Sequence, residues 1–277
     1  MRRLLRLLGI GLLVLVVTAG VQGIWSALLV INLTRQPTIP WAVAAMAVLL
    51  WVSWRYADGR WWPSRTARMR RAYLRAHQVS ARVFAIAVTA GACALVALTG
   101  LWIVLFQSGL MRGNRLPDLS PYPKPTVVAV LLMAALVGAF VEEAGFRGYL
   151  QVALERELSA PVAVAIAAFA LTPGHGATQG FAWPTIVFYF FVDVMLGVTA
   201  WACNSVWPGI IVHSSGLLIF FTLVWPFDAG RPEFGDALTD PWFWLHAVQA
   251  LAFSGLAVLA FRRLTYAAKK EHANTAF

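Results

Sequence analysis

Ionisable residues interrupt several long apolar stretches of this sequence, and most are of types that can transfer protons. They are Glu142, Glu143, Arg147, His175, Asp193 and His213. An ionisable side chain at the centre of a membrane helix costs about 2.5–3.5 kcal/mol on insertion scales, so such residues are rare there and usually functional. We therefore expect the chemistry of this protein at these positions.

The segment from Glu142 to Arg147 holds the densest group of these charges. On a helix, Glu143 and Arg147 lie one turn apart with the acid first, which is the better order for an ion pair. Glu142 is rotated from Glu143 by about 100°, so it needs a different partner. A carboxylate beside a neutral histidine in a partly wetted cavity is suited to accept a proton from water. The alternative is a buried ion-pair cluster that only joins helices, and the spacing fits both interpretations.

The elements that position these residues must be membrane helices. Of the 277 residues, 60% are hydrophobic and 12% are charged, whereas soluble domains carry about 25% charged residues. The apolar runs predict spans near Leu7–Ile31, Pro40–Trp54, Val83–Gln107, Val127–Arg147, Pro161–Thr172, Pro184–Cys203, Trp207–Trp225 and Trp242–Phe261. We therefore predict an all-α fold, a polytopic transmembrane helical bundle of about eight spans. The simplest organisation is a single membrane domain over residues 1–277.

The fifth predicted span ends just before the first of the two histidines. Pro173 and Gly174 directly precede His175, so we expect the helix to break there. At about 1.5 Å per residue, Glu142 and His213 count to the same half of the bilayer, whereas His175 counts further outward.

Basic residues lie mainly on one side of this arrangement. With the amino terminus in the cytoplasm, alternate loops place most of the 22 lysines and arginines inside, as the positive-inside rule requires. Eight arginines fall in residues 55–82, which we predict to be a basic cytoplasmic loop containing a helix on the bilayer surface. The acidic segment Asp228–Asp240 is predicted to be external. We expect an inner, plasma-membrane location with both termini in the cytoplasm.

Charge and cysteine content also limit the partners. A net charge of +10 could suit nucleic acid, but basic loops of a membrane protein meet anionic lipid instead, so we expect a lipid bilayer and no nucleic acid. Cys93 and Cys203 lie in apolar spans without disulfide or metal spacing, which indicates packing roles. Met1–Gly23 is similar to a signal peptide, but its apolar stretch continues too far, so we expect an uncleaved anchor.

Glu142, Glu143 and Arg147 form the pattern EExxxR, and two histidines follow on later spans. This combination resembles the CPBP intramembrane protease family, which includes the CAAX prenyl endopeptidases and the bacterial Abi proteins. The resemblance covers about residues 127–221, which we expect to be a protease-like core. The segment Pro208–His213 is also similar to the family.

Two motifs of this family are incomplete here. The family's FxxxH motif has Leu171 four residues before His175, with Phe169 displaced by two positions. Its third motif has Asn or Asp four residues after the second histidine, His213, and this chain has Leu217. Leucine can neither donate nor accept a hydrogen bond. The polar residues available to substitute are Ser214, Ser215 and Asn204.

The resemblance implies hydrolysis of a peptide bond. Glu142 with His175 would activate a water for attack on the carbonyl carbon. His213 would stabilise the developing oxyanion, and Glu143 with Arg147 would support the site. Loss of one oxyanion donor, worth about 2.7–4 kcal/mol, would slow such an enzyme by orders of magnitude without abolishing its activity.

The same residues raise the question of a metal cofactor. Glu142, His175 and His213 would suit Zn²⁺ with a bound water, because two histidines and a glutamate form a catalytic zinc set in other proteases. The sequence has no HExxH motif, and the family is also described as using glutamate-activated water. We therefore expect no tightly bound metal.

Three functions fit these residues. We predict an intramembrane endopeptidase that cuts a membrane-associated peptide or protein near the cytoplasmic face. Leu217 favours instead a non-catalytic scaffold or immunity-type protein that retains the fold. A proton-coupled transporter would use the same acids as a relay, although repeated broken helices are not evident. Asp193 either bonds a neighbouring helix or lines a water path, and His246 is expected near the membrane interface.

Overall fold

The structure, a computed structural model, describes residues 2–111, 118–224 and 239–275. Apart from loops and one isolated β-bridge between Ala76 and Ser205, these residues are helical. The helices are α1 (Arg2–Arg35), α2 (Trp41–Ala57), η1 (Ser64–Thr66), α3 (Ala67–Leu74), α4 (Ala81–Gln107), α5 (Lys124–Glu142), η2 (Glu143–Leu150), α6 (Gln151–Glu155), α7 (Ala160–Gln179), α8 (Trp183–Cys203), α9 (Trp207–Ile219), η3 (Phe220–Val224) and α11 (Pro241–Thr275).

Length and composition make most of these helices membrane spans. In the described residues, six helical stretches are long and apolar enough to cross a bilayer, and α2 and α9 with its extension are shorter apolar helices. A bilayer offers no water to unpaired backbone groups, so helices that pair their own N–H and C=O groups are the stable solution. The chain is therefore an integral membrane protein, and the predicted all-α bundle is confirmed.

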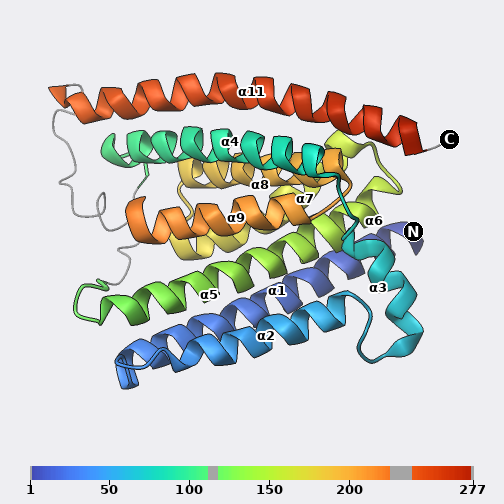
Figure 1. The fold of residues 1–277 in the computed structure, drawn as a ribbon, viewed down its shortest axis with the longest axis horizontal. Helices are drawn as coiled ribbons and strands as arrows, with labels where there is room; N and C mark the ends of the chain where they lie inside the picture. The colour runs from blue at the N-terminus through green and yellow to red at the C-terminus, as the bar shows by residue number, and fades with distance from the viewer. Residues whose placement is uncertain (1, 112–117, 225–238, 276–277) are drawn as a thin grey trace.

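The α5 helix lies in the middle of the bundle and contacts α1, α2 and α9. Figure 1 shows α4 and α11 running side by side along one edge, with α2 at the opposite edge. Both chain ends and α3 lie at the same end of the bundle (Figure 1).

The helix that carries the EExxxR pattern is longer than predicted. It runs from Lys124 to Glu155, beyond the expected end at Arg147. Its middle section, η2, is a π-helix that begins at Glu143. Such wider turns occur mostly inside α-helices and frequently at functional sites. The apolar pattern of the sequence does not distinguish this turn from a regular α-helical one.

The predicted helix break before His175 is wrong. The α7 helix continues through Pro173 and His175 to Gln179. A proline removes one backbone donor, but a membrane helix tolerates it because neighbouring groups satisfy the freed carbonyl better than lipid would. The Thr172 hydroxyl also donates to the Ala168 carbonyl at 2.9 Å, within the turn that leads into the proline. By contrast, Pro184 and Pro208 stand in the first turns of α8 and α9, where no donor is lost.

The basic segment 55–82 differs in part from the predicted surface helix. Its α3 helix has only eight residues, and two of its arginines point into the protein. Arg70 is buried and donates to the Pro63 carbonyl at 3.1 Å. Arg75 is buried in an ion pair with Glu155. Because these two guanidinium groups find protein acceptors, only the remaining exposed arginines are free to meet lipid.

One predicted feature lies mostly outside the described residues. The acidic segment expected to be external spans residues 228–240, of which only Thr239 and Asp240 belong to the described part. The end of the seventh predicted span at Trp225 also lies outside it.

Candidate active site

Two adjacent glutamates meet one histidine inside the bundle. His213, on α9, places its Nδ1 atom 3.0 Å from Glu143 Oε1. Its other ring nitrogen, Nε2, lies 3.6 Å from Glu142 Oε2. Because a carboxylate only accepts hydrogen bonds, Glu143 requires the proton on Nδ1. The Nε2 atom then faces Glu142 as the ring nitrogen that can gain or lose a proton.

Glu143 also contacts the arginine of the same motif. Arg147 Nη1 lies 3.6 Å from Glu143 Oε1, so the contact expected from their one-turn spacing is present. The other guanidinium nitrogen, Nη2, lies 2.6 Å from Asp193 Oδ1. Glu143, Arg147 and Asp193 are each at most 1% exposed. Of the two readings of Asp193, the bond to a neighbouring helix is confirmed.

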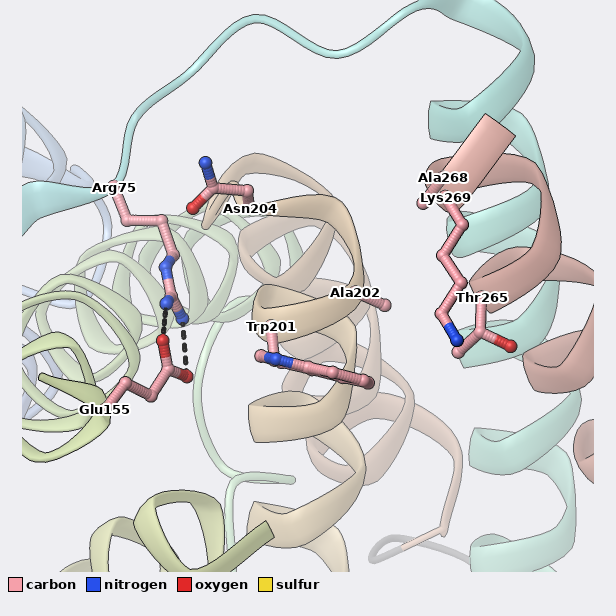
Figure 2. A pocket seen from close by; sticks show the side chains of 8 residues that line it. All are labelled: Arg75, Glu155, Trp201, Ala202, Asn204, Thr265, Ala268 and Lys269. Carbon is pink, nitrogen blue, oxygen red and sulfur yellow. Dashed lines mark hydrogen bonds and ion pairs between the residues drawn. The ribbon is translucent and has the colours of Figure 1, made fainter. Parts of the chain in front are cut away.

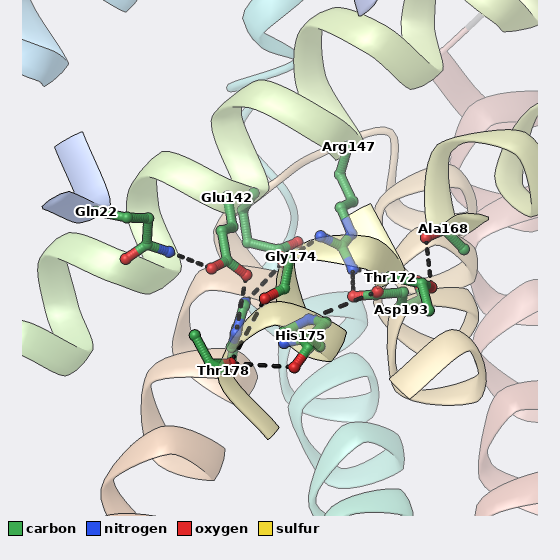
Figure 3. Close-up of polar contacts among 11 residues, drawn as sticks. Gln22, Glu142, Arg147, Ala168, Thr172, Gly174, His175, Thr178 and Asp193 are labelled. Atoms are coloured by element: carbon green, nitrogen blue, oxygen red, sulfur yellow. Dashed lines mark hydrogen bonds and ion pairs between the residues drawn. The ribbon is translucent and has the colours of Figure 1, made fainter. Parts of the chain in front are cut away.

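His175 reaches the cluster through Asp193. Its Nε2 atom lies 3.7 Å from Asp193 Oδ2, and its ring stacks on Tyr189 with centroids 4.3 Å apart. Figure 3 shows His175 beside Asp193 and Arg147, at the opposite side of the cluster from Gln22. Among the described residues, His175 forms its ion pair with Asp193 rather than with Glu142. The expectation that Glu142 and His175 lie within direct or water-bridged reach of each other stays a prediction.

This arrangement follows from helix geometry. Asp193 and His175 lie on α8 and α7, which pack against each other. The acidic oxygens of Asp193 therefore lie between His175 and Arg147. In the sequence, Asp193 is an isolated acid within an apolar run. Its partners, Arg147 and His175, are identified only by the way the helices pack.

Sequence reasoning missed two contributors from α1. Gln22 donates from Nε2 to Glu142 Oε1, and the Trp25 indole N–H donates to Gln22 Oε1. Figure 3 shows Gln22 reaching Glu142 from the side of the cluster away from His175. The available signal was a glutamine within an apolar run. A single uncharged amide indicates a functional site less strongly than a charged residue does, and Gln22 belongs to no motif identified in the sequence.

A close backbone approach positions the glutamate pair. A Cβ atom added to Gly209 would lie 2.6 Å from Glu143 Oε2, which is too close for two unbonded atoms. Glycine at this position of α9 therefore leaves room for the Glu143 carboxylate between α9 and η2. His213 follows one helical turn later and meets the same carboxylate.

Leu217 stands one further turn along α9, beside α5 and α1. A Cβ atom added to Gly138 would lie 3.7 Å from Leu217 Cδ1 and 3.7 Å from Gln22 Oε1. Leu217 thus lies on the same side of the cluster as the Gln22 amide. Of the three polar residues considered as substitutes, Ser215 donates to the Ile211 carbonyl at 2.8 Å and Asn204 lies in the turn after α8.

The oxygen atoms of the two glutamates are not equivalent. Glu142 Oε1 accepts from Gln22, whereas its buried Oε2 accepts no hydrogen bond from a described residue. Glu143 Oε1 is shared by His213 and Arg147, and its Oε2 also accepts no hydrogen bond from a described residue. The cluster thus holds three carboxylates, a single guanidinium and two histidines.

The acid and histidine side chains of the cluster are also of the types that bind metal ions. Among the described residues, no group of three or more His, Cys, Asp or Glu side chains is arranged to hold one. The suggested zinc set of Glu142, His175 and His213 does not converge, because His175 is directed to Asp193. The Arg147 guanidinium also lies within the cluster, where it would repel a cation.

A polar cavity lies at the end of the bundle near α3. It has a volume of about 440 Å³, and Figure 2 shows the Arg75–Glu155 ion pair on one wall and Lys269 on the opposite wall. Gln151 donates to Glu155 at 2.8 Å and to the Gly197 carbonyl at 3.0 Å. This cavity is therefore tied to the helix that carries the glutamates, although none of the predicted site residues lines it.

The remaining residues singled out in the sequence lie apart from the cluster. His246 on α11 lies 3.1 Å from Gln249, which donates to the Val96 carbonyl of α4. Cys93 and Cys203 are free cysteines. Cys203 packs in an apolar cluster with residues of α4 and α11, as expected for it.

The fold defines a polytopic helical membrane protein, and the site is a buried acid–histidine cluster in its interior. Residues 124–216, about a third of the chain, match the family model described as Type II CAAX prenyl endopeptidase Rce1-like. This segment runs from α5 into α9 and contains all five predicted site residues. The match supports membership of the CPBP/CAAX family and a CAAX-type intramembrane protease kind of function. No curated protein and no solved structure matches the chain significantly.

Proposed function

We propose that this protein is an intramembrane endopeptidase in which Glu142 activates the attacking water. The observation that carries this proposal is the buried Oε2 atom of Glu142. It accepts no hydrogen bond from a described residue and lies 3.6 Å from His213 Nε2. A carboxylate oxygen with a free lone pair inside a low-dielectric site is suited to accept a proton from water.

The proposed reaction moves one proton twice. The water oxygen attacks the carbonyl carbon of the peptide bond while Glu142 Oε2 accepts a water proton. When the carbon–nitrogen bond breaks, the same proton passes from Glu142 to the leaving amine. Glu142 returns to its starting state, so the cycle balances without a further reactant.

His213 is the proposed donor to the developing oxyanion, a role that requires the doubly protonated ring, because Nδ1 already donates its proton to Glu143. Its Nδ1 atom is held by Glu143 at 3.0 Å, so the ring is fixed and its Nε2 side faces Glu142. Arg147 and Asp193 hold Glu143 in place through buried ion pairs. His175 is a second donor at the more exposed side of the cluster, where its side chain is 20% exposed.

The proposed substrate is a membrane-associated peptide or protein. The matched family model carries the description of a CAAX prenyl endopeptidase. A prenylated carboxy-terminal CAAX peptide is therefore the first probe to use. An otherwise identical peptide without the prenyl group separates a requirement for the lipid from a requirement for the sequence.

The test is cleavage of these two peptides by the full-length protein in liposomes. Wild type should cleave at least the prenylated peptide, and Glu142→Gln should abolish cleavage because an amide cannot accept the proton. Glu157→Gln is a matched control, because Glu157 is a more exposed acid that pairs with Arg3. This variant should cleave the peptides like wild type. Full biological function in the Glu142→Gln variant would instead support the non-catalytic scaffold.

A further inference from the structure

The geometry points to Gln22 and Trp25 of α1 as positioning residues for Glu142, which would make α1 part of the active site. This inference rests on the proposed role of Glu142 as the base. Neither residue belongs to the segment matched by the family model. Gln22 donates to Glu142 Oε1, and Trp25 donates to Gln22 Oε1.

The two hydrogen bonds fix the orientation of the amide. An indole nitrogen is only a donor, so the atom of Gln22 that faces Trp25 must be its oxygen. The NH₂ group then faces Glu142, which as a carboxylate can only accept. Trp25 and Glu142 therefore select the same amide orientation, and a flip would break both contacts.

The amide decides which glutamate oxygen can react. With Oε1 occupied by Gln22, the carboxylate plane is held and Oε2 is the oxygen left toward His213. Without this donor, the side chain of Glu142 could rotate, and either oxygen could turn away from His213. A misplacement of about 1 Å at a reacting group can cost about 10²-fold in rate.

The position of Gln22 argues against a role at the membrane surface. It lies in the middle of the 34-residue helix α1, far from either end. A side-chain amide at such a depth finds no water and needs a protein partner. The side chain is partly buried against α5, next to Gly138 and Leu217. Gln22 thus supplies an amide beside the position where this chain has Leu217.

The test compares the kinetics of Gln22→Leu and Trp25→Phe with wild type in liposomes, using the prenylated CAAX peptide. Gln22→Leu should lower kcat by about 10²-fold with little change in KM, because substrate binding does not require the amide. Trp25→Phe keeps the ring and removes the N–H, so it should lower kcat by a smaller factor. If Gln22→Leu does not fold, Trp25→Phe still tests the inference.

The matched control is Thr18→Val, one turn earlier on α1. Thr18 packs beside Gly145 rather than beside Glu142. The kcat of the Thr18→Val variant should therefore equal that of wild type. A wild-type kcat in both Gln22→Leu and Trp25→Phe would overturn the inference and leave the proposed function intact.

A stability cycle tests the contact without relying on catalysis. Gln22→Leu and Glu142→Leu should each lower Tm, and the double variant should lose less than the sum, because two matched apolar groups leave no orphaned partner. Additive losses of Tm would overturn the inference. Failure of wild type to cleave either peptide, together with non-additive losses, would reject the proposed function and support the positioning contact.

Discussion

At the scale of single residues, the two adjacent glutamates differ in the side chains that contact their partnered oxygen. Glu143 is fully buried and shared by Arg147 and His213. Glu142 is held through one oxygen by Gln22, and its other oxygen accepts nothing from the described residues. Glu143 Oε2 likewise accepts no hydrogen bond from the described residues. The difference is therefore in the other oxygen, which contacts two cationic or proton-carrying side chains in Glu143 and a neutral amide in Glu142.

The first prediction follows from this difference. Glu143→Gln should lower the free energy of unfolding by about 1–3 kcal/mol, because a buried ion pair loses its charge. Glu142→Gln should change stability less, since its Gln22 contact tolerates an amide oxygen as acceptor. Thermal unfolding of both variants in detergent measures this, and equal stability losses would contradict the distinction.

A second prediction concerns Leu217. Leu217→Asn places an amide one turn beyond His213 and should raise turnover of an authentic substrate by about 10²-fold, given the usual worth of one oxyanion donor. The polar side chain should also cost about 1–3 kcal/mol of stability if it finds no partner. Cleavage rates and thermal unfolding of this variant measure both effects. Loss of stability without a gain in turnover would favour the scaffold interpretation.

A third prediction concerns metal removal. If water is activated by Glu142 alone, treatment with EDTA followed by dialysis should leave the cleavage rate unchanged. Addition of Zn²⁺ to the treated protein should not increase it. A loss of cleavage that Zn²⁺ restores would show that a metal takes part.

At the scale of secondary-structure elements, the site depends on how closely α9 approaches η2. Gly209 makes this approach possible, because a methyl group there would lie 2.6 Å from Glu143 Oε2. The carboxylate could move only by leaving His213 and Arg147, its two partners.

The fourth prediction is therefore that Gly209→Ala lowers the cleavage rate by about 10²-fold through displacement of Glu143. Gly255→Ala is the matched control. Gly255 lies on α11, and a methyl group added there meets nothing within 4 Å. The measurement is cleavage in liposomes for both variants. A fully active Gly209→Ala protein would show that the close approach is not needed.

Much of the architecture could be predicted from the sequence because charge is so unevenly distributed in it. Apolar runs gave the helices, and EExxxR indicated the ion pair between Glu143 and Arg147. The π-helical turn, the continuity of α7 through Pro173 and the partner of His175 could not be predicted. Each of these depends on how separate helices pack, and no local pattern of residue types records that.

At the scale of the whole molecule, both termini and α3 lie at one end (Figure 1). The loop before α5 lies at the opposite end (Figure 1). The exposed arginines are concentrated near α3, which is the distribution expected of the cytoplasmic side.

The fifth prediction is that Ser64 is cytoplasmic and Ser120 is external. Single cysteines at these two exposed positions, in a protein lacking Cys93 and Cys203, should react differently with a membrane-impermeant reagent in intact cells. Ser120→Cys should be labelled, and Ser64→Cys should be labelled only after the cells are opened. The reverse pattern would invert the topology.

The distribution of the site over many helices also bears on how the protein is made. Glu143 leaves the ribosome 70 residues before its partner His213, a delay of roughly 4–14 s at about 5–20 residues per second. Gln22, by contrast, precedes Glu142 by 120 residues and is already in the membrane when the acids arrive. During biogenesis, α1 and Arg147 are therefore the first partners to shelter these acids from lipid, before α8 and α9 complete the site.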